Sequence, residues 1–245
     1  MEKEAYRQHF ELEETFWWFV GRREAIRSLL SPLFGEEAKQ PKRRILDAGC
    51  GTGGLLGFFE RYGEVWGMDL SPLALGYCVK KNGTGRLIQG SATSLPFSDG
   101  QFDLVAACDV LYHKEISDDT VALREFYRVC KRSGHLLLTD SAFRALRSPH
   151  DDFFHGIRRY TVGELRRKMK AAHFRIERIS YLNMLLFPAV TLWRKTRRRA
   201  SGSDLVPPPP WVNRFLESLF CREARLLRKH NLPFGTSVIC LAKKV

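Results

Sequence analysis

The chain has 245 residues, with 40 lysines and arginines against 27 aspartates and glutamates and a formal net charge of +13. This length suits one α/β domain with an appendage, and the absence of a signal pattern or of any apolar run of ~18 residues argues against a secreted or membrane-spanning protein. The six cysteines are scattered without zinc-ligand spacing, so we expect reduced thiols and no metal in a cytoplasmic protein.

The first 40 residues predict an aromatic lid followed by a helix. Residues 1–20 are acidic and aromatic and end in Thr-Phe-Trp-Trp-Phe-Val. Aromatic side chains packed this densely rarely stay in water. We therefore expect this segment to cover a pocket of the domain that follows. From Arg22 to Phe34, apolar residues recur at the spacing of a helix.

The most informative run is Ile45–Gly54, which reads Ile-Leu-Asp-Ala-Gly-Cys-Gly-Thr-Gly-Gly. An apolar strand enters it, glycines then allow a tight turn against a ligand, and a helix begins near Leu55. This is the nucleotide-binding corner of doubly wound α/β folds. A second strand ends at Asp69, 18 residues beyond Gly51, where an acidic residue is placed to bind ribose hydroxyls. The alternative is that Asp69 caps the next helix.

Strands and helices alternate beyond this corner, which predicts a parallel sheet with right-handed crossovers. The expected strands are 43–48, 64–69, 86–91, 102–108, 134–140 and 174–181. The expected helices are 54–61, 72–82, 118–131 and 161–173.

Residues 183–235 interrupt this pattern and predict a helical insertion. A basic cluster follows an apolar stretch within 182–199, a proline-rich linker spans 201–210, and 211–230 has helical spacing. Between Phe153 and Arg199, 13 lysines and arginines face two glutamates, so this stretch carries +11 of the charge. Such a patch indicates either an anionic partner or a solvated basic exterior.

Four motifs in sequence order resemble class I S-adenosylmethionine-dependent methyltransferases: Ile45–Gly54, Asp69, Gly90–Phe97 and Phe102–His113. The Trp-Trp-Phe block near the N-terminus and the Arg-Arg-Tyr-Thr helix start are similar to the small-molecule, type 11-like branch of that family. The resemblance implies a Rossmann-like, seven-stranded, doubly wound sheet with an antiparallel last strand. It divides the chain into an N-terminal lid and helix (1–40), a cofactor-binding core (41–182), a helical insertion (183–235) and a final strand (236–245).

The resemblance also implies roles for individual residues toward S-adenosyl-L-methionine. Asp47 organises the loop or the methionine amino group, and Asp69 binds the ribose. Arg22 is expected to pair with the methionyl carboxylate, and Trp18 to close the site, with ordinary core packing an equal alternative for Trp18. The remaining cofactor-binding candidates are Gly49, Cys50, Gly51, Leu70, Ala92, Thr93 and Cys108.

Three histidines are the candidate catalytic residues on the acceptor side. His113 follows the fourth strand, where family members place a residue near the reacting methyl group; its alternative is a solvent-facing loop position. His150 and His155 lie after the fifth strand, at the end where α/β enzymes build active sites. The neighbouring run 158–160, Arg-Arg-Tyr, either binds an anion or forms salt bridges with the acidic pair at 151–152.

The motifs thus predict methyl transfer to an oxygen or carbon of a small or lipid-linked acceptor. The turn after Cys108 lacks the Asn/Asp-Pro-Pro-Tyr sequence of base-modifying enzymes, which disfavours nucleic acid. Residues 182–199 either lie in an anionic interface at the inner membrane surface or pack as a helical cap. A nicotinamide-dependent oxidoreductase and a non-catalytic binding module are the alternative functions.

Overall fold

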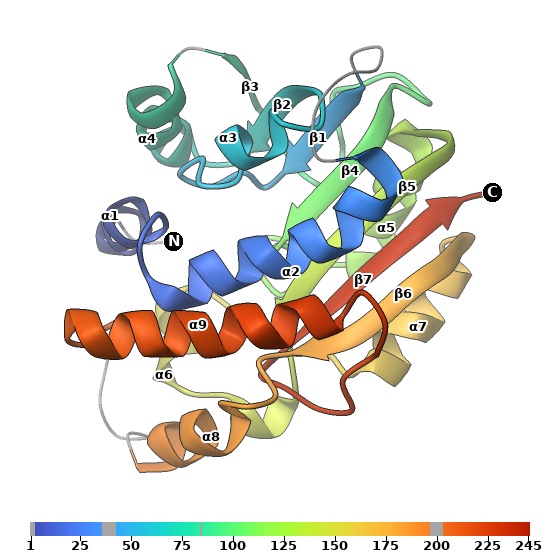
Figure 1. Cartoon of the computed structure of the whole chain (residues 1–245). Helices are drawn as coiled ribbons and strands as arrows, with labels where there is room; N and C mark the ends of the chain where they lie inside the picture. Colours follow the sequence, from blue (N-terminus) through green and yellow to red (C-terminus); the bar gives the residue numbers. More distant parts are fainter. Residues whose placement is uncertain (1–2, 36–42, 84, 197–202) are drawn as a thin grey trace.

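A seven-stranded sheet forms the centre of the computed structural model, which describes residues 3–35, 43–83, 85–196 and 203–245 (Figure 1). The strand order is β3-β2-β1-β4-β5-β7-β6, and only β7 runs antiparallel to its neighbours. The predicted Rossmann-like sheet with an antiparallel last strand is confirmed. The strands are β1 (Arg44–Ala48), β2 (Glu64–Asp69), β3 (Arg86–Gln89), β4 (Phe102–Cys108), β5 (Cys130–Ser141), β6 (Phe174–Leu182) and β7 (Ser237–Lys244).

The central strands are buried along almost their whole length because helices cover both faces of the sheet. In β4, all residues except Asp103 are buried. Helices α2 (Trp17–Phe34) and α9 (Pro210–Leu226) lie side by side across one face, and α5 (Asp119–Val129) and α7 (Val162–Ala171) cover the other (Figure 1). The remaining helices are α1 (Lys3–Leu12), α3 (Leu56–Phe59), α4 (Pro72–Asn82), α6 (Pro149–Phe153) and α8 (Phe187–Thr196), with a short 3₁₀ turn at Arg144–Leu146.

Several element boundaries differ from those expected from the sequence. The helix expected over 54–61 shrinks to α3, the helix expected from Arg22 already begins at Trp17, and the strand expected over 86–91 ends at Gln89. The helix expected over 118–131 ends at Val129, because Cys130 adopts an extended backbone (φ −69°, ψ 135°) and pairs with Phe102. Sheet pairing thus overrides helical periodicity at the end of α5.

The N-terminal segment is fastened to the glycine loop by one buried carboxylate. Glu13 follows α1, and its carboxylate accepts hydrogen bonds from Thr52 Oγ1 (2.8 Å) and Lys81 Nζ (2.5 Å). Gly54 belongs to the same contact, since a Cβ there would collide with the Glu13 carboxylate. These bonds hold α1 over the C-terminal edge of the sheet.

The helices between β6 and β7 return to the N-terminal segment. Asn213 of α9 accepts a hydrogen bond from Trp17 N (3.0 Å) and donates one to Thr15 O (2.8 Å). In the stretch 203–209, Leu205 is buried against Phe16 and Phe19. Residues 1–20 therefore pack against the insertion as well as against the sheet.

The closest approach of α2 to α9 generates a test of this packing. Gly21 of α2 faces the Phe220 ring so closely that a Cβ would overlap it. We expect Gly21→Ala to lower the free energy of unfolding by ~1–3 kcal/mol through overpacking, measured by chemical denaturation. Gly76→Ala in α4 is the matched control, because a Cβ there meets nothing within 4 Å; it should stabilise the protein by ~0.5–1 kcal/mol. Equal effects of the two substitutions would contradict this packing.

Candidate active site

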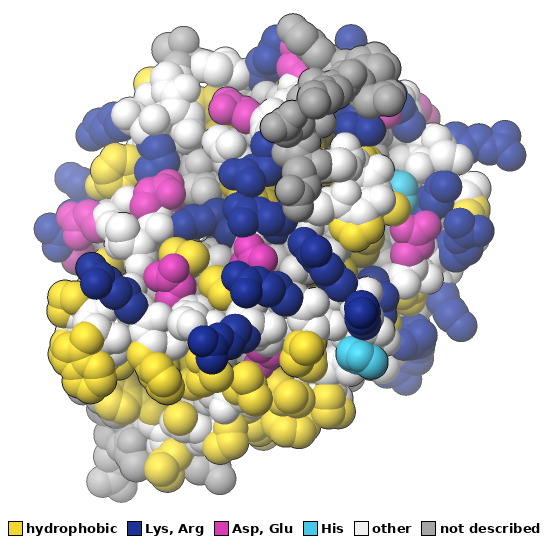
Figure 2. All heavy atoms as spheres, viewed as in Figure 1, with side chains coloured by type: hydrophobic (Ala, Val, Ile, Leu, Met, Phe, Trp, Pro, Cys, Tyr) yellow, Lys and Arg dark blue, Asp and Glu magenta, His cyan; other side chains and the backbone are white. Residues whose placement is uncertain are grey.

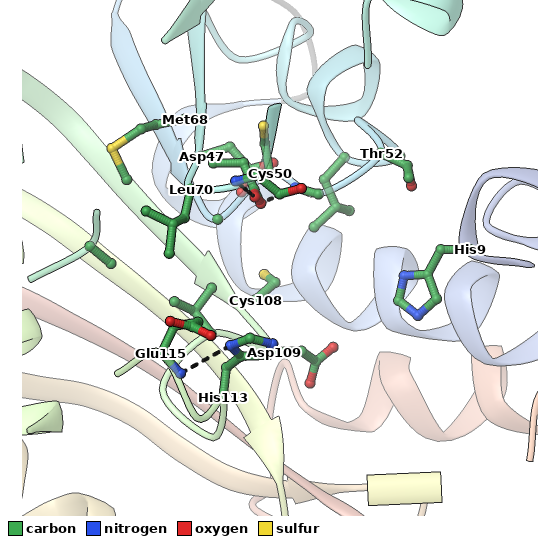
Figure 3. Close-up of a pocket in the computed structure, with 18 of the residues that line it drawn as sticks. His9, Asp47, Cys50, Thr52, Met68, Leu70, Cys108, Asp109, His113 and Glu115 are labelled. Atoms are coloured by element: carbon green, nitrogen blue, oxygen red, sulfur yellow. Dashed lines mark hydrogen bonds between the residues drawn. The ribbon is translucent and has the colours of Figure 1, made fainter. Parts of the chain in front are cut away.

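A cavity of about 410 Å³ opens where β1, β2 and β4 end, beneath α1 (Figure 3). It lies at the carboxyl edge of the sheet, on both sides of the point where strand order reverses between β1 and β4. In Figure 3, Asp47, Cys50 and Leu70 approach it from one side, Cys108, Asp109 and His113 from the opposite side, and His9 from α1. Ten of the residues expected at the site line it: Arg22, Asp47, Gly49, Cys50, Gly51, Asp69, Leu70, Ala92, Cys108 and His113.

The glycine loop turns back over β2 and exposes its backbone to the cavity. The amides of Gly49 and Cys50 both donate to Met68 O, at 2.7 and 2.9 Å. Gly49 has φ +82°, and a Cβ there would lie 2.5 Å from Val110. Gly51 has φ +56° with open space around it, so its backbone conformation, rather than crowding, favours glycine.

Asp69 holds this loop in place from the end of β2. Its Oδ2 accepts from Gly51 N and its Oδ1 from Ser71 N, both at 2.9 Å. The N-cap of α4 is Ser71, whose Oγ accepts from Ala74 N (3.3 Å). Asp69 is therefore a bridge between the loop and the helix start rather than the cap itself. Burial raises the pKa of its carboxyl, although the backbone amides oppose that rise.

Asp47 places an unpaired carboxylate oxygen in the cavity wall. The side chain is 1% exposed, and its Oδ2 has no hydrogen-bond partner among the described residues. Burial raises the pKa of this carboxyl to about 7, against the opposing charge of Arg22. A buried polar atom without a partner is costly. The site is thus suited to a cationic or hydrogen-bond-donating group of a ligand.

Opposite the loop, an ion pair joins α2 to the end of β4. The guanidinium Nη1 of Arg22 bonds to Asp109 Oδ2, and Asp109 adopts φ +58°, which is unusual for a residue with a side chain. Burial is the largest single influence and disfavours the charged form of Arg22, but Asp109 together with the other acidic groups around it outweighs burial, and the Arg22 pKa is raised. Beside them, burial raises the pKa of the Cys108 thiol to about 12. Cys108 therefore contributes an uncharged side chain to the cavity wall.

A second cavity of about 600 Å³ adjoins the first, and three residues line both: His9, Asp109 and Tyr112. Trp18 lies in this second cavity and not in the first. Its indole stacks on Phe220 of α9, with ring centroids 5.2 Å apart. Because α9 is distant in sequence, the residues around Trp18 did not indicate this packing partner.

The three candidate histidines do not line one common cavity. His113 lines the first cavity; its Nδ1 accepts from Glu115 N (3.3 Å), and burial lowers its pKa to about 4. His150 lines the second cavity, where its Nδ1 accepts from Asp204 N (3.0 Å). His155 lines neither cavity, and its ring lies 5.8 Å from that of His113. Thr93 also lies outside both cavities, with its hydroxyl 2.8 Å from that of Ser91.

The arginines of the Arg-Arg-Tyr run (158–160) bind other parts of the protein. Arg159 forms a buried, two-pronged ion pair with Asp151 (2.8 and 3.0 Å), the salt-bridge alternative of the sequence analysis. Arg158 donates to the carbonyls of Ile116 (2.5 Å) and Ser117 (2.7 Å). Within the described ranges, no group of three or more His, Cys, Asp or Glu residues is placed to hold a metal ion.

The residues of the first cavity that the sequence analysis did not name as site residues include Tyr6, His9, Asp109 and Tyr112. Asp109 directly follows Cys108 at the end of β4, so its position in the sequence could have predicted that it lines the cavity. Tyr6 and His9 carry no local signal, because only the folding of α1 over the sheet edge brings them there.

Comparison with known proteins shows a family match over part of the chain. Residues 46–138 match the sequence model of the family described as "Methyltransferase domain". Malonyl-[acyl-carrier protein] O-methyltransferase of Enterobacter lignolyticus is 32% identical over 114 residues, 44% of either chain. Demethylmenaquinone methyltransferase of Thermotoga maritima is 31% identical over 121 residues, 44% of this chain and 52% of that one. The chain thus spans about half the length of these curated relatives.

A solved structure extends the likeness to the whole fold. The crystal structure of an S-adenosylmethionine-dependent methyltransferase from Thermotoga maritima superposes with a TM-score of 0.59 at 19% identity, and the match covers 100% of both chains. At that identity the superposition supports the fold alone, whereas the sequence match spans the glycine loop and β4. Residues 46–138 thus match a methyltransferase domain, and the chain as a whole is similar in fold to an S-adenosylmethionine-dependent methyltransferase.

Proposed function

We propose that this protein transfers a methyl group from S-adenosylmethionine to an oxygen or carbon of a small or lipid-linked acceptor. The observation that carries the proposal is the first cavity, in which a glycine loop, the bridging Asp69 and the unpaired Asp47 oxygen surround one space within the family match. The methyltransferase relatives favour this reading over a nicotinamide-dependent oxidoreductase or a non-catalytic binding module.

The described residues fit this cofactor. We assign Asp69 to the ribose hydroxyls, because its carboxylate lies in the cavity wall next to the loop. Leu70 and Ala92 provide apolar surface for the adenine. The unpaired Oδ2 of Asp47 suits the ammonium group of the methionine part. Arg22 has its Nε without a partner among the described residues, which leaves a donor for the methionine carboxylate beside its bond to Asp109.

The bound cofactor supplies a methyl group that its sulfonium already activates. The protein therefore has mainly to align the acceptor and exclude water, effects that contribute ~7–11 kcal/mol in well-oriented reactions. Residues of α1 and Glu13, which bonds to Thr52 in the glycine loop, cover part of the cavity. Where the acceptor is a hydroxyl, a general base is required. His113, which lines the first cavity next to Tyr112 in sequence, is neutral above about pH 4 and could accept a proton.

We further propose that the outer face of α8 and α9 contacts an anionic membrane. Trp211 and Phe215 of α9 are 74% and 62% exposed, and Leu192 of α8 is 64% exposed. Arg214 and Arg222 are exposed on the same helix α9. Figure 2 shows apolar side chains along the lower edge of this face with lysines and arginines above them. Apolar side chains beside basic ones suit the surface of an anionic bilayer.

The basic cluster Arg197–Arg199, which the sequence analysis placed in this contact, lies outside the described residues. No described helix is long and apolar enough to cross a bilayer. The contact proposed here is accordingly at the membrane surface, and it rests on α8 and α9 alone.

Binding of S-adenosylhomocysteine tests the cofactor assignment. We expect calorimetry to show binding that Asp69→Asn weakens at least tenfold, because the amide cannot accept from both ribose hydroxyls while it holds Gly51 and Ser71. Asp99→Asn is the matched control, since that side chain is 81% exposed on the surface. No binding at millimolar ligand, or equal binding by Asp69→Asn, would refute the assignment.

The pKa of Asp47 predicts how this affinity depends on pH. Below about pH 7 the carboxyl is protonated and neutral, and above it the carboxylate attracts the ligand ammonium group. The affinity for S-adenosylhomocysteine should therefore rise with pH up to about 7 and then level off. Asp47→Asn, which cannot ionise, should bind more weakly and lose this rise. A profile that is the same in both proteins would show that Asp47 does not face the ammonium group.

Sedimentation with phosphatidylserine-containing vesicles tests the membrane contact. We expect Trp211→Ser combined with Phe215→Ser to reduce the bound fraction at least tenfold, because two large exposed apolar side chains no longer enter the interface. Raising the salt concentration should also release the protein, by screening α9 from the vesicle charge. Ile157→Ser, at another exposed apolar position, is the control and should bind normally. Binding unaffected by both changes would rule out this face.

A further inference from the structure

The second cavity has an apolar roof built from segments that are far apart in the sequence. Phe16 and Trp18 come from the N-terminal block, Leu186, Val190 and Trp193 from α8 and the residues before it, and Leu205 from the stretch before α9. Its volume of about 600 Å³ lies within the range of cavities that hold small-molecule ligands. An apolar space of this size favours a ligand with a substantial hydrocarbon body.

The floor of the same cavity is polar, because it is the carboxyl edge of the sheet. Four residues at the ends of adjacent strands line it: Asp109 after β4, Ser141 at the end of β5, Ser237 at the start of β7 and Asn183 after β6. Neighbouring strands lie ~4.8 Å apart, so the three steps from β4 to β6 span about 14 Å. These four polar residues therefore form a row across the cavity floor, which we call the polar stripe.

An unsatisfied polar atom lies at one end of this stripe, and the other end adjoins the cofactor cavity. Asn183 is 2% exposed; its Nδ2 donates to Thr236 Oγ1 (3.0 Å), while its Oδ1 is buried without a partner among the described residues. At the other end, Tyr112 and Asp109 line both this cavity and the cofactor cavity. A buried acceptor such as Asn183 Oδ1 requires a donor to avoid its desolvation cost.

We infer that the second cavity binds the methyl acceptor, and that this acceptor is an elongated amphipathic molecule, apolar along one side and polar along the other. One polar group, the one to be methylated, lies against Asp109 and Tyr112, and a hydroxyl or amide donor at the far end bonds to Asn183 Oδ1. Its role as the acceptor site rests on the proposed methyl transfer; its preference for such a molecule does not.

Equilibrium displacement of the fluorescent probe N-phenyl-1-naphthylamine tests the site without requiring turnover. We expect the probe to bind the full chain and to be displaced by a steroid diol with a hydroxyl at each end. The matched steroid that lacks one hydroxyl should need at least tenfold higher concentration, because Asn183 Oδ1 then stays unpaired. Val190→Trp should abolish probe binding by filling the cavity, whereas Leu192→Trp, exposed on the same helix and outside the cavity, should bind the probe normally.

Asn183→Gly tests the far end of the stripe. Asn183 has φ +61°, which glycine adopts without strain, and the substitution should remove the preference for the diol. Retained binding of S-adenosylhomocysteine shows that each variant is folded. Probe binding by Val190→Trp, an unchanged diol preference in Asn183→Gly, or stronger displacement by a simple fatty acid than by the diol would overturn the inference. Diol binding without S-adenosylhomocysteine binding would instead refute the proposed function and leave the ligand preference standing.

Discussion

The Arg22–Asp109 ion pair is the interaction on which the arrangement of both cavities depends. It links α2, which follows the N-terminal segment, to the end of β4, the strand next to the point where strand order reverses. Removing one member of a fully buried pair typically costs ~3–5 kcal/mol, and the partial exposure of Asp109 reduces that figure here. The pair also holds Asp109 at positive φ, so that its carboxylate faces the cofactor cavity and the second cavity together.

A second set of bonds fixes the roof over this pair. Glu13 ties the end of α1 to Thr52 in the glycine loop and to Lys81 in α4. Gln8 Nε2 donates to Leu205 O (2.9 Å), which ties α1 to the stretch before α9. The N-terminal segment is therefore one wall of both cavities.

The two cavities differ in how much the relatives reveal about them. The family match covers residues 46–138, which contain the glycine loop, Asp69 and β4. The second cavity takes most of its lining from residues before 20 and after 140, outside that match. Sequence likeness to enzymes named for malonyl-acyl carrier protein or demethylmenaquinone therefore bears on the cofactor side. The acceptor has to be inferred from this chain's own apolar roof and polar floor.

The sequence by itself predicted the sheet, the glycine loop and the position of Asp69, because each depends on local periodicity or on fixed spacing within one strand–loop–helix unit. The type of cofactor followed from the resemblance of four ordered motifs to a methyltransferase family. Tertiary structure decided which residues lie across the cavities from this strand–loop–helix unit. Trp18 packs on Phe220 and His150 accepts from the Asp204 amide, both partners distant in sequence, while His9 and Tyr112 join Asp109 between the cavities. No local pattern encodes such contacts, since they exist only once α1, α8 and α9 close over the carboxyl edge of the sheet.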